Sequence, residues 1–527
     1  MPLLSPSARS RFANGARHAM LGLYGLGWLW SSALTIGALA GVRVSRPRFE
    51  AAGLTLGLGL VAFAWLRAQP SSSEAVTGEP ELAPRTLIIV PAIVAILAFG
   101  WSLTLGPLSD DFVLWHWAAA GTFVPGGWPY FRPLALVIWR AILAIGGGWM
   151  ALHVVNGALH AFNSALVCRI GSAWLGRRAG LTAGVLFAAF PASSEAVAWT
   201  AGVFDLLATA SVLSAVAIVL WMPSSARRTI ALFVVCLAGM LSKESAIVIP
   251  AVLLIVTTLA SRRRSISTDW TPIVVSASVA AAFLIVRMAM SPAVAAHFQA
   301  LPADRRGWKD LFVRPFAGLA LPVRTDAGVG LGAYLSAIVV LAIVGILLLQ
   351  ALRGERRERA EPESVLRARG IAIGVSWIIL GALPLLGEFY VSPTLAGSRY
   401  LYLPSAGFTW LVSAVLAGKS SRALNVIAWI VLLALVSVYT SGLHAERRVW
   451  TEAAKTRDAI LSGATEAARA MSCGSLRVDG VPEDIHGAYV FGSGLREALA
   501  AIPLRPDGRA CLLRWTGTTI VAGESGG

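Results

Sequence analysis

Two adjacent carboxylates, Asp110 and Asp111, lie in the stretch Gly106-Pro-Leu-Ser-Asp-Asp-Phe, directly after a strongly apolar segment. Two neighbouring negative charges raise the pKa of one member, which suits a general base or a cation site. A single acid would simply end a membrane helix, but an aromatic-rich loop follows this pair and leads to Arg132 in the stretch Tyr-Phe-Arg-Pro-Leu. We therefore expect Asp110 and Asp111 to be catalytic.

Four polar side chains, His153, Asn156, His160 and Asn163, recur in a later apolar segment at spacings of three, four and three residues. On a helix this spacing confines them to an arc of roughly 80°. Because polar groups face lipid only at a high cost, the stripe is expected to face the protein interior. The two deeper residues, His160 and Asn163, favour a structural hydrogen-bonded seam. His153 lies nearer the end of the segment and is predicted to line a substrate site.

Further charged residues lie at the same predicted level. Glu195 follows a Phe-Pro turn and would by itself be an ordinary loop acid, whereas Asp205 lies inside the next apolar segment. An ionisable group at such a position marks a site or a buried ion pair. Lys243 and Glu244 join two apolar segments in the stretch Leu-Ser-Lys-Glu-Ser. They form either an ion pair that solvates itself or a site where Lys243 meets an anion such as a lipid phosphate.

A last candidate stretch, Ser-Arg-Tyr-Leu-Tyr-Leu-Pro-Ser, contains Arg399 and Tyr400. Tyrosines are common where membrane helices meet water, so they need no further function there. The planar guanidinium of Arg399, in contrast, suits a phosphate group. The predicted substrate-binding residues are Arg132, His153, Glu195, Asp205, Lys243, Glu244, Arg399 and Tyr400.

The composition places these residues in a membrane. Of the 527 residues, 56% are hydrophobic and only 14% are charged, whereas soluble domains have roughly 25% charged residues. The net charge of +16 is spread between apolar segments, so it indicates membrane topology rather than a nucleic-acid partner. The four cysteines show no spacing typical of a metal site.

The apolar segments predict an all-α polytopic membrane protein with about 13 transmembrane helices. Two segments, at 20–42 and 51–67, precede a Ser/Pro/Glu-rich linker. Eleven more follow, at 86–106, 149–171, 178–192, 199–221, 229–243, 245–260, 271–290, 332–352, 370–387, 400–417 and 424–443. Residues 133–145 are expected to form a helix at the membrane interface, because Arg140 divides it. The predicted parts are 1–85 with two additional helices, a catalytic core at 86–450, and a small domain at 451–527.

The basic residues predict which ends of the helices face the cytoplasm. Arg177, Arg227, the triple arginine at 262–264 and the run at 353–369 fall on one side if 133–145 does not span. By the positive-inside bias this side is cytoplasmic, so the acids and the C-terminal part are extracytoplasmic. The loop 291–329 departs from this bias, and so do the arginines at 43, 46 and 48. A bacterial inner membrane is the expected location.

The C-terminal 80 residues are less hydrophobic and predict a small α/β extracytoplasmic domain. Its two cysteines, Cys473 and Cys511, could pair on an oxidising side or remain free thiols. A bridge between them would contribute about 3 to 4 kcal/mol by restricting the unfolded chain.

The order of these motifs resembles the membrane half of the transmembrane and tetratricopeptide-repeat-containing O-mannosyltransferases and their bacterial relatives. The family belongs to the GT-C superfamily of glycosyltransferases, which use polyprenyl-phosphate sugars. The resemblance covers roughly residues 86–450, and no tetratricopeptide repeats follow. The motifs that carry it are Asp110-Asp111, Tyr130-Phe-Arg-Pro-Leu, His153-x2-Asn-x3-His-x2-Asn163, Phe187-Ala-Ala-Phe-Pro-x3-Glu195, Gly202-x2-Asp205, Leu241-Ser-Lys-Glu244 and Arg399-Tyr-Leu-Tyr-Leu-Pro-Ser.

The resemblance implies a GT-C-like helical fold whose first outer loop carries the catalytic acid. Asp110 or Asp111 would deprotonate an acceptor hydroxyl on a protein or glycan. Glu195 and Asp205 would support the sugar or the acceptor, and Lys243 and Arg399 would meet the donor phosphate. The sugar, which could be mannose, would be transferred with inversion in a single displacement. No cofactor is assigned, although carboxylates could hold Mg²⁺ or Mn²⁺.

Two other classes of function fit a polytopic membrane protein. A transporter or lipid flippase would place polar groups near the membrane midplane, often within inverted repeats, whereas these acids gather at one surface. A scaffold without catalytic activity would not need the acids and cations together. The sequence therefore favours a glycosyltransferase, with a transporter or flippase as the alternative.

Overall fold

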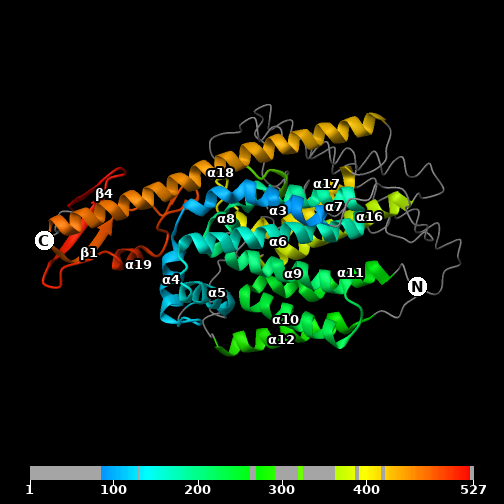
Figure 1. The fold of residues 1–527 in the computed structure, drawn as a ribbon, viewed down its shortest axis with the longest axis horizontal. Coiled ribbons are helices and arrows are strands. Elements are labelled where there is room, and N and C mark those ends of the chain that lie inside the picture. Colours follow the sequence, from blue (N-terminus) through cyan, green and yellow to red (C-terminus); the bar gives the residue numbers. More distant parts are fainter. Residues whose placement is uncertain are drawn as a thin grey trace, which may run out of the picture.

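The structure is a computed structural model that describes residues 85–126, 128, 130–261, 269–290, 318–324, 362–385, 391–416 and 422–522. Long helices lie side by side and form a bundle (Figure 1). The predicted segments at 20–42, 51–67 and 332–352 lie outside the described residues. The long helices are α3 (Thr86–Phe99), α6 (Trp149–Leu175), α7 (Arg177–Ala188), α9 (Val203–Trp221), α10 (Ala226–Ser242), α11 (Ile249–Ser261), α12 (Thr271–Met290), α16 (Pro362–Ala382), α17 (Tyr402–Leu416) and α18 (Arg422–Ala470).

In the described part of the chain, four helices are long and apolar enough to cross a membrane: Thr86–Thr104, Trp149–Leu175, Thr200–Trp221 and Thr271–Ala289. A fifth span is present if Arg177–Ala188 and Pro191–Ala198, which meet at 53°, count as one. The expected number of about 13 spans is therefore not confirmed. Some predicted spans are shorter apolar helices, such as Glu244–Thr258 and Gly370–Ala382, and a straight span needs about 20 residues.

Short elements lie together at one end of the bundle and contact one another and the helix ends there. The predicted interfacial helix is present as α5 (Pro133–Ala144) and packs beside α4 (Asp110–Ala120). The other short elements are η1 (Gly100–Thr104), η2 (Pro191–Ser193), α8 (Ser194–Ala198), η3 (Thr200–Gly202), η4 (Glu244–Val248), η5 (Leu383–Leu385) and η6 (Ser398–Leu401).

Local sequence explains the two breaks between α7 and α9. Phe190 is extended before Pro191, as expected for a residue that precedes proline. At the second break a Cβ on Gly202 would lie 2.1 Å from the carbonyl oxygen of Ala196, so only glycine permits this close approach. These breaks fold α8, which carries Glu195, against the end of the bundle.

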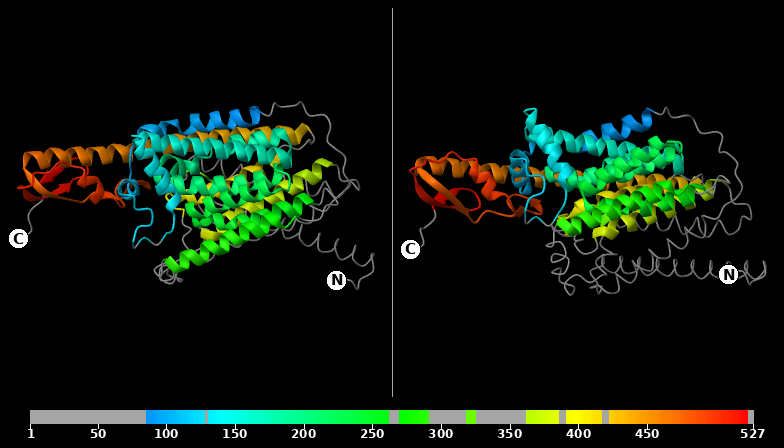
Figure 2. Two further views of the ribbon diagram at one scale, coloured as in Figure 1. Left: turned by 60° about the horizontal axis from the view of Figure 1, so that its bottom comes forward. Right: turned by 90° about the horizontal axis from the view of Figure 1, so that it is seen from below.

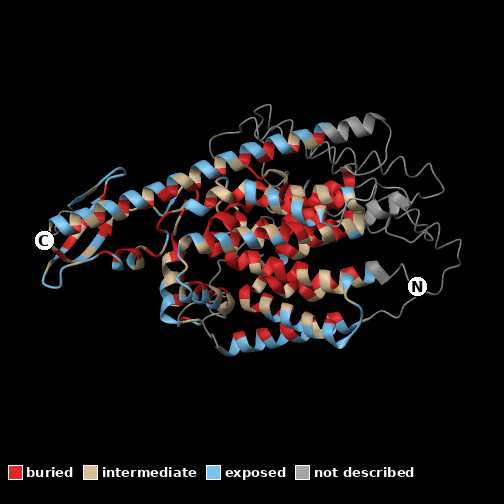
Figure 3. Ribbon diagram, in the orientation of Figure 1, coloured by how far each residue is buried: buried red, intermediate tan, exposed pale blue. Residues whose placement is uncertain are grey.

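The interior of the bundle is buried (Figure 3), and many large apolar side chains are exposed on its outer surface. Leu97 on α3, Ile285 on α12 and Leu433 on α18 are 78%, 69% and 66% exposed. Apolar side chains exposed on helices of this hydropathy are expected to face lipid.

The C-terminal part is an α/β unit at the end of α18, as predicted. Helix α18 has 49 residues, or about 74 Å at 1.5 Å per residue, and it extends beyond the bundle (Figure 2). It runs unbroken across the predicted boundary at residue 451. The unit contains α19 (Leu495–Ala500) and a sheet in the order β1 (Cys473–Asp479), β4 (Arg509–Trp515), β5 (Ile520–Ala522), with β1 and β4 parallel. The strands β2 (Asp484–Ile485) and β3 (Ala488–Tyr489) form a separate antiparallel pair.

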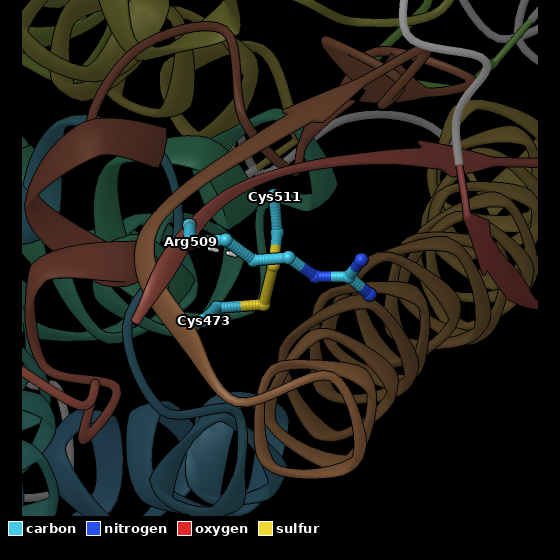
Figure 4. The surroundings of a disulfide bond; sticks show 3 residues. All are labelled: Cys473, Arg509 and Cys511. Atoms are coloured by element: carbon cyan, nitrogen blue, oxygen red, sulfur yellow. Dashed lines mark hydrogen bonds between the residues drawn. A yellow bond between two sulfur atoms is a disulfide. The ribbon is translucent and has the colours of Figure 1, made fainter. Parts of the chain in front are cut away.

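Cys473 on β1 and Cys511 on β4 form a disulfide, which is one of the two alternatives left open by the sequence (Figure 4). The bridge joins residues 38 positions apart.

We expect Cys473→Ser/Cys511→Ser to lower the stability of the C-terminal unit by about 3 to 4 kcal/mol, because the open chain gains conformational entropy when unfolded. Thermal unfolding in detergent with and without reductant would measure this. The double variant should no longer respond to reductant, since Cys168 and Cys236 are buried thiols. An equal response in both proteins would contradict the prediction.

Candidate active site

A cavity of about 340 Å³ lies where the short elements meet the ends of the helices. Its lining includes six residues that the sequence analysis selected: Asp110, Arg132, Asp205, Lys243, Arg399 and Tyr400. They come from segments as far apart as α4 and η6, so the fold brings distant acids and cations together. Aromatic rings form much of the remaining wall: Trp117, Trp128, Tyr130, Trp199 and Phe204.

The two adjacent carboxylates at the start of α4 have different surroundings. Asp110 lines the cavity, and the Ser493 hydroxyl donates a hydrogen bond to its Oδ1. Asp111 is fully buried and does not belong to the lining. Its Oδ2 accepts the Leu108 N–H and its Oδ1 accepts the Ala201 N–H, both at 2.8 Å. Asp110 is therefore the carboxylate placed to act on a bound molecule, whereas Asp111 ties the loop before α4 to η3.

Burial raises the pKa of Asp111 to about 7, because the hydrogen bonds from Leu108 and Ala201 only partly offset its desolvation. The nearby charge of Asp110 adds a smaller increase. The sequence analysis expected one raised pKa in this pair, but burial rather than the neighbouring charge is the main cause.

This raised pKa predicts that the protein loses stability as the pH rises. Between the unfolded pKa of about 4 and the folded pKa of about 7, the folded state binds more protons than the unfolded state. The free energy of unfolding therefore falls across this window by up to roughly 4 kcal/mol and is level above it. Thermal unfolding from pH 4 to 8 would measure the slope. Asp111→Asn should reduce that slope, and an unchanged slope would exclude Asp111 as its source.

Lys243 and Asp205 form a buried ion pair beside the cavity. Lys243 Nζ lies 2.6 Å from Asp205 Oδ1, and the two side chains are only 4% and 8% exposed. The Lys243 ammonium also lies 5.0 Å from the ring centroid of Tyr400. The attraction between the two charges offsets part of the free-energy cost of burying them. It also holds the ammonium at the cavity wall.

Arg399 is held by Glu195, Tyr489 and aromatic rings. Its guanidinium pairs with Glu195 and donates to the Tyr489 hydroxyl at 3.1 Å, and that hydroxyl donates to Glu195 Oε1 at 3.0 Å. The ring centroids of Trp199 and Tyr400 lie 5.1 and 4.9 Å from its central carbon. Glu195 is outside the cavity lining, so it orients Arg399 rather than lining the cavity with it.

Arg132 has a similar arrangement. Its Nη2 and Nε donate to Glu244 Oε2 at 2.6 and 2.9 Å, and its central carbon lies 4.0 Å from the Tyr130 ring centroid. Glu244 also pairs with Arg287 of α12 at 3.4 Å. Arg132 lines the cavity while Glu244 does not, so Glu244 positions Arg132 instead of binding a ligand there.

The polar stripe on α6 faces the protein interior, as predicted. His153, which was predicted to line a substrate site, is not in the cavity lining. Its Nε2 donates to the Gly106 carbonyl at 3.2 Å, so it supports the loop before Asp110. Asn156 donates to the Trp199 carbonyl at 2.9 Å. The deeper residues form the expected seam, with His160 bonded to Tyr402.

Residues of the C-terminal part of the chain also build the cavity and its surroundings, and they were not predicted from the sequence. Ser493 lines the cavity and Tyr489 binds Arg399. Arg457 of α18 donates to the carbonyls of Leu105 and Pro107, which anchors the loop before Asp110. In the sequence, Ser493 stands between two glycines after an apolar stretch. Such a pattern marks a turn, and it is the local signal that could have drawn attention to Ser493.

The described residues contain no group of three or more His, Cys, Asp or Glu side chains that could hold a metal ion. Of the cavity carboxylates, Asp205 is engaged by Lys243 and Asp110 by Ser493. The Mg²⁺ or Mn²⁺ considered from the sequence stays a prediction.

No protein-family model matches this sequence. Two solved structures show a distant likeness: ArnT from Cupriavidus metallidurans bound to undecaprenyl phosphate, and an oligosaccharyltransferase of Archaeoglobus fulgidus in the apo form. The first is 14% identical and has a TM-score of 0.44, over 81% of this chain and 93% of that chain. The second is 12% identical and has a TM-score of 0.39, over 69% of this chain and 56% of that chain. These scores are too low to carry a conclusion about fold or function.

A curated relative shows a closer similarity in sequence. The chain is 36% identical over 154 residues to Protein O-mannosyl-transferase Tmtc2 of Drosophila melanogaster. The match covers 26% of this chain and 16% of that protein. The resemblance seen in the motifs is thus confirmed: over about a quarter of its length, the chain is similar to a protein O-mannosyl-transferase.

Proposed function

We propose that this protein is a membrane glycosyltransferase that moves a sugar from a polyprenyl-phosphate donor to an acceptor hydroxyl. One observation carries the proposal: a carboxylate, Asp110, and two cations, Lys243 and Arg399, line a single cavity at the end of apolar helices. The name of the curated relative supports mannose as the sugar and a protein hydroxyl as the acceptor.

Asp110 would act as the general base. It accepts the proton of the acceptor hydroxyl while the hydroxyl oxygen attacks the anomeric carbon of the sugar. The bond between that carbon and the phosphate oxygen breaks, and the configuration at the carbon inverts. Because both reactants are held in one cavity, the protein removes much of the entropic cost of bringing them together.

Lys243 and Arg399 would bind the leaving phosphate. An ammonium has three N–H donors and a guanidinium has five, so pairing with Asp205 and Glu195 leaves donors for phosphate oxygens. Charge that develops on the phosphate oxygen is stabilised best by cations already fixed in place. Arg132 supplies a third cation at the wall. In this proposal, these three cations stabilise the charge of the leaving phosphate.

The aromatic wall supports a sugar and lipid ligand. Trp117, Trp128, Trp199, Phe204 and Tyr400 surround the polar groups. Aromatic rings bury large areas, and aromatic walls with convergent polar groups are typical of ligand sites. Excluded water would also make the interactions of the cations stronger.

We place the cavity on the extracytoplasmic side of a bacterial inner membrane. The positions of the basic turns favour this orientation. The Cys473–Cys511 disulfide supports it too, because such bonds persist in oxidising compartments.

The test is transfer by the purified protein in nanodiscs. Polyprenyl phosphates carrying labelled mannose, glucose or arabinose would be offered with a serine- and threonine-rich peptide or a glycan acceptor. We expect labelled acceptor and free polyprenyl phosphate in equal amounts, with and without EDTA. Movement of intact donor across a vesicle membrane without cleavage would instead indicate a flippase. If no donor is cleaved or moved, the result would instead indicate a scaffold without catalytic activity.

A further inference from the structure

A short segment of the C-terminal part lies against the catalytic loop. We define residues 489–494 as the docking segment. Ser109 N–H donates to the Val490 carbonyl at 3.0 Å, and Ser493 N–H donates to the Ser109 hydroxyl oxygen at 3.1 Å. The Phe491 ring stacks on that of Phe112, with centroids 5.9 Å apart. The segment therefore grips the residue that immediately precedes Asp110.

Ser109 needs such support because its backbone conformation is unfavourable. Its φ is 49° and its ψ is −116°, outside the regions that non-glycine residues normally adopt. Such a conformation is costly and persists only where its surroundings hold it. Both its N–H and its hydroxyl are bonded to the docking segment. This conformation also sets the direction in which α4 begins, and Asp110 is the first residue of α4.

The fit between the two segments depends on a glycine. Gly494 has a φ of 75°, and a Cβ there would lie 2.3 Å from the Ser109 carbonyl oxygen. The contact thus tolerates no side chain at this position. Such a close approach brings the neighbouring Ser493 hydroxyl to Asp110 Oδ1, at the wall of the cavity.

The docking segment also reaches the cation on the other side of the cavity. The Tyr489 hydroxyl accepts from Arg399 and donates to Glu195. Its ring lies 4.7 Å from that of Trp199, centroid to centroid. One segment of six residues thus touches both the proposed base and the ion pair that holds a proposed phosphate-binding group.

We propose that the C-terminal domain completes the catalytic site, with Ser493 as the positioning residue for Asp110. Its hydroxyl holds Oδ1, which leaves Oδ2 to accept the proton of the acceptor hydroxyl. This inference rests on the proposed function, since it assigns a role in the same transfer reaction.

Kinetics of Ser493→Ala in the full-length protein test the inference. We expect kcat to fall roughly tenfold or more, as for loss of a hydrogen bond to a charged group. The KM for the acceptor should stay within about twofold, because the hydroxyl acts through Asp110. Ser493→Thr keeps the hydroxyl and should restore kcat.

Two further variants separate positioning from folding. Ser475→Ala changes an exposed serine on β1 of the same domain and should behave as the wild type. Gly494→Ala should push the docking segment away from Ser109 and reproduce the loss in kcat. Thermal unfolding of each purified variant would confirm that it is folded.

The outcomes distinguish this inference from the proposed function. If Asp110→Asn removes transfer but Ser493→Ala keeps the wild-type kcat, only the role of Ser493 is overturned. Equal losses of kcat in Ser493→Ala and Ser493→Thr would make the residue structural and would also overturn its positioning role. If Asp110→Asn transfers sugar normally, the proposed base itself is wrong.

Discussion

Asp110→Asn is expected to lower sugar transfer by roughly a thousandfold, because general bases contribute typically 10²- to 10⁴-fold to a rate. The asparagine carbonyl can still accept the hydrogen bond from Ser493, so the loop should keep its conformation. What the variant loses is the ability to take a proton. Release of polyprenyl phosphate from a labelled donor would measure the effect, with the amount of folded protein determined in parallel.

The neighbouring acid provides a contrast. Asp111→Asn places an NH₂ group near one of the two N–H donors that Asp111 now accepts, from Leu108 and Ala201. We expect it to affect the stability of the loop more than the chemistry. Asp507→Asn, in an exposed turn, is the control for loss of a negative charge. Asp110 would not be the base if Asp110→Asn kept more than a tenth of wild-type turnover.

Lys243→Met is expected to destabilise the protein by about 3 to 5 kcal/mol, because it leaves Asp205 buried without its partner. The double variant Lys243→Met/Asp205→Asn removes both charges and should recover most of that loss, yet transfer should remain absent. Thermal and denaturant unfolding in detergent would give the stabilities, and donor cleavage would give the activities.

This design separates the structural role of the pair from its role toward phosphate. Full recovery of transfer in the double variant would show that the Lys243 ammonium does not bind the donor. Equal instability of the single and double variants would show that Asp205 does not depend on Lys243. As a comparison, Arg477→Met breaks the exposed pair with Asp479 and should change stability very little.

Helix positions could be predicted closely where a segment is apolar throughout. The segment predicted at 271–290 matches α12 (Thr271–Met290), and that at 86–106 nearly matches α3 with η1. Charged residues inside apolar segments were equally informative. Burying Asp205 or Lys243 costs free energy, and an ion-pair partner or a binding site offsets that cost. Such signals are local, so the sequence shows them directly.

The number of spans and the division of roles between adjacent acids depend on tertiary packing. Apolar composition does not distinguish a spanning helix from a shorter buried one, as for Gly370–Ala382. Neighbouring residues on a helix point about 100° apart, so Asp110 and Asp111 point in different directions, and the sequence does not show which of them faces the cavity. The Ala201 N–H, 90 residues away, is what marks Asp111 as the inward acid. The contacts from Tyr489 and Ser493 are more distant still.

The bond between Ser493 and Asp110 joins residues 383 positions apart. During synthesis the membrane helices emerge long before Ser493 does, and contacts of such high sequence separation form late in folding. A nascent or truncated chain would thus embed in the bilayer with its proposed base unaligned. By the proposed mechanism, such a chain would leave the lipid-linked donor intact until the C-terminal part has folded against the helix bundle.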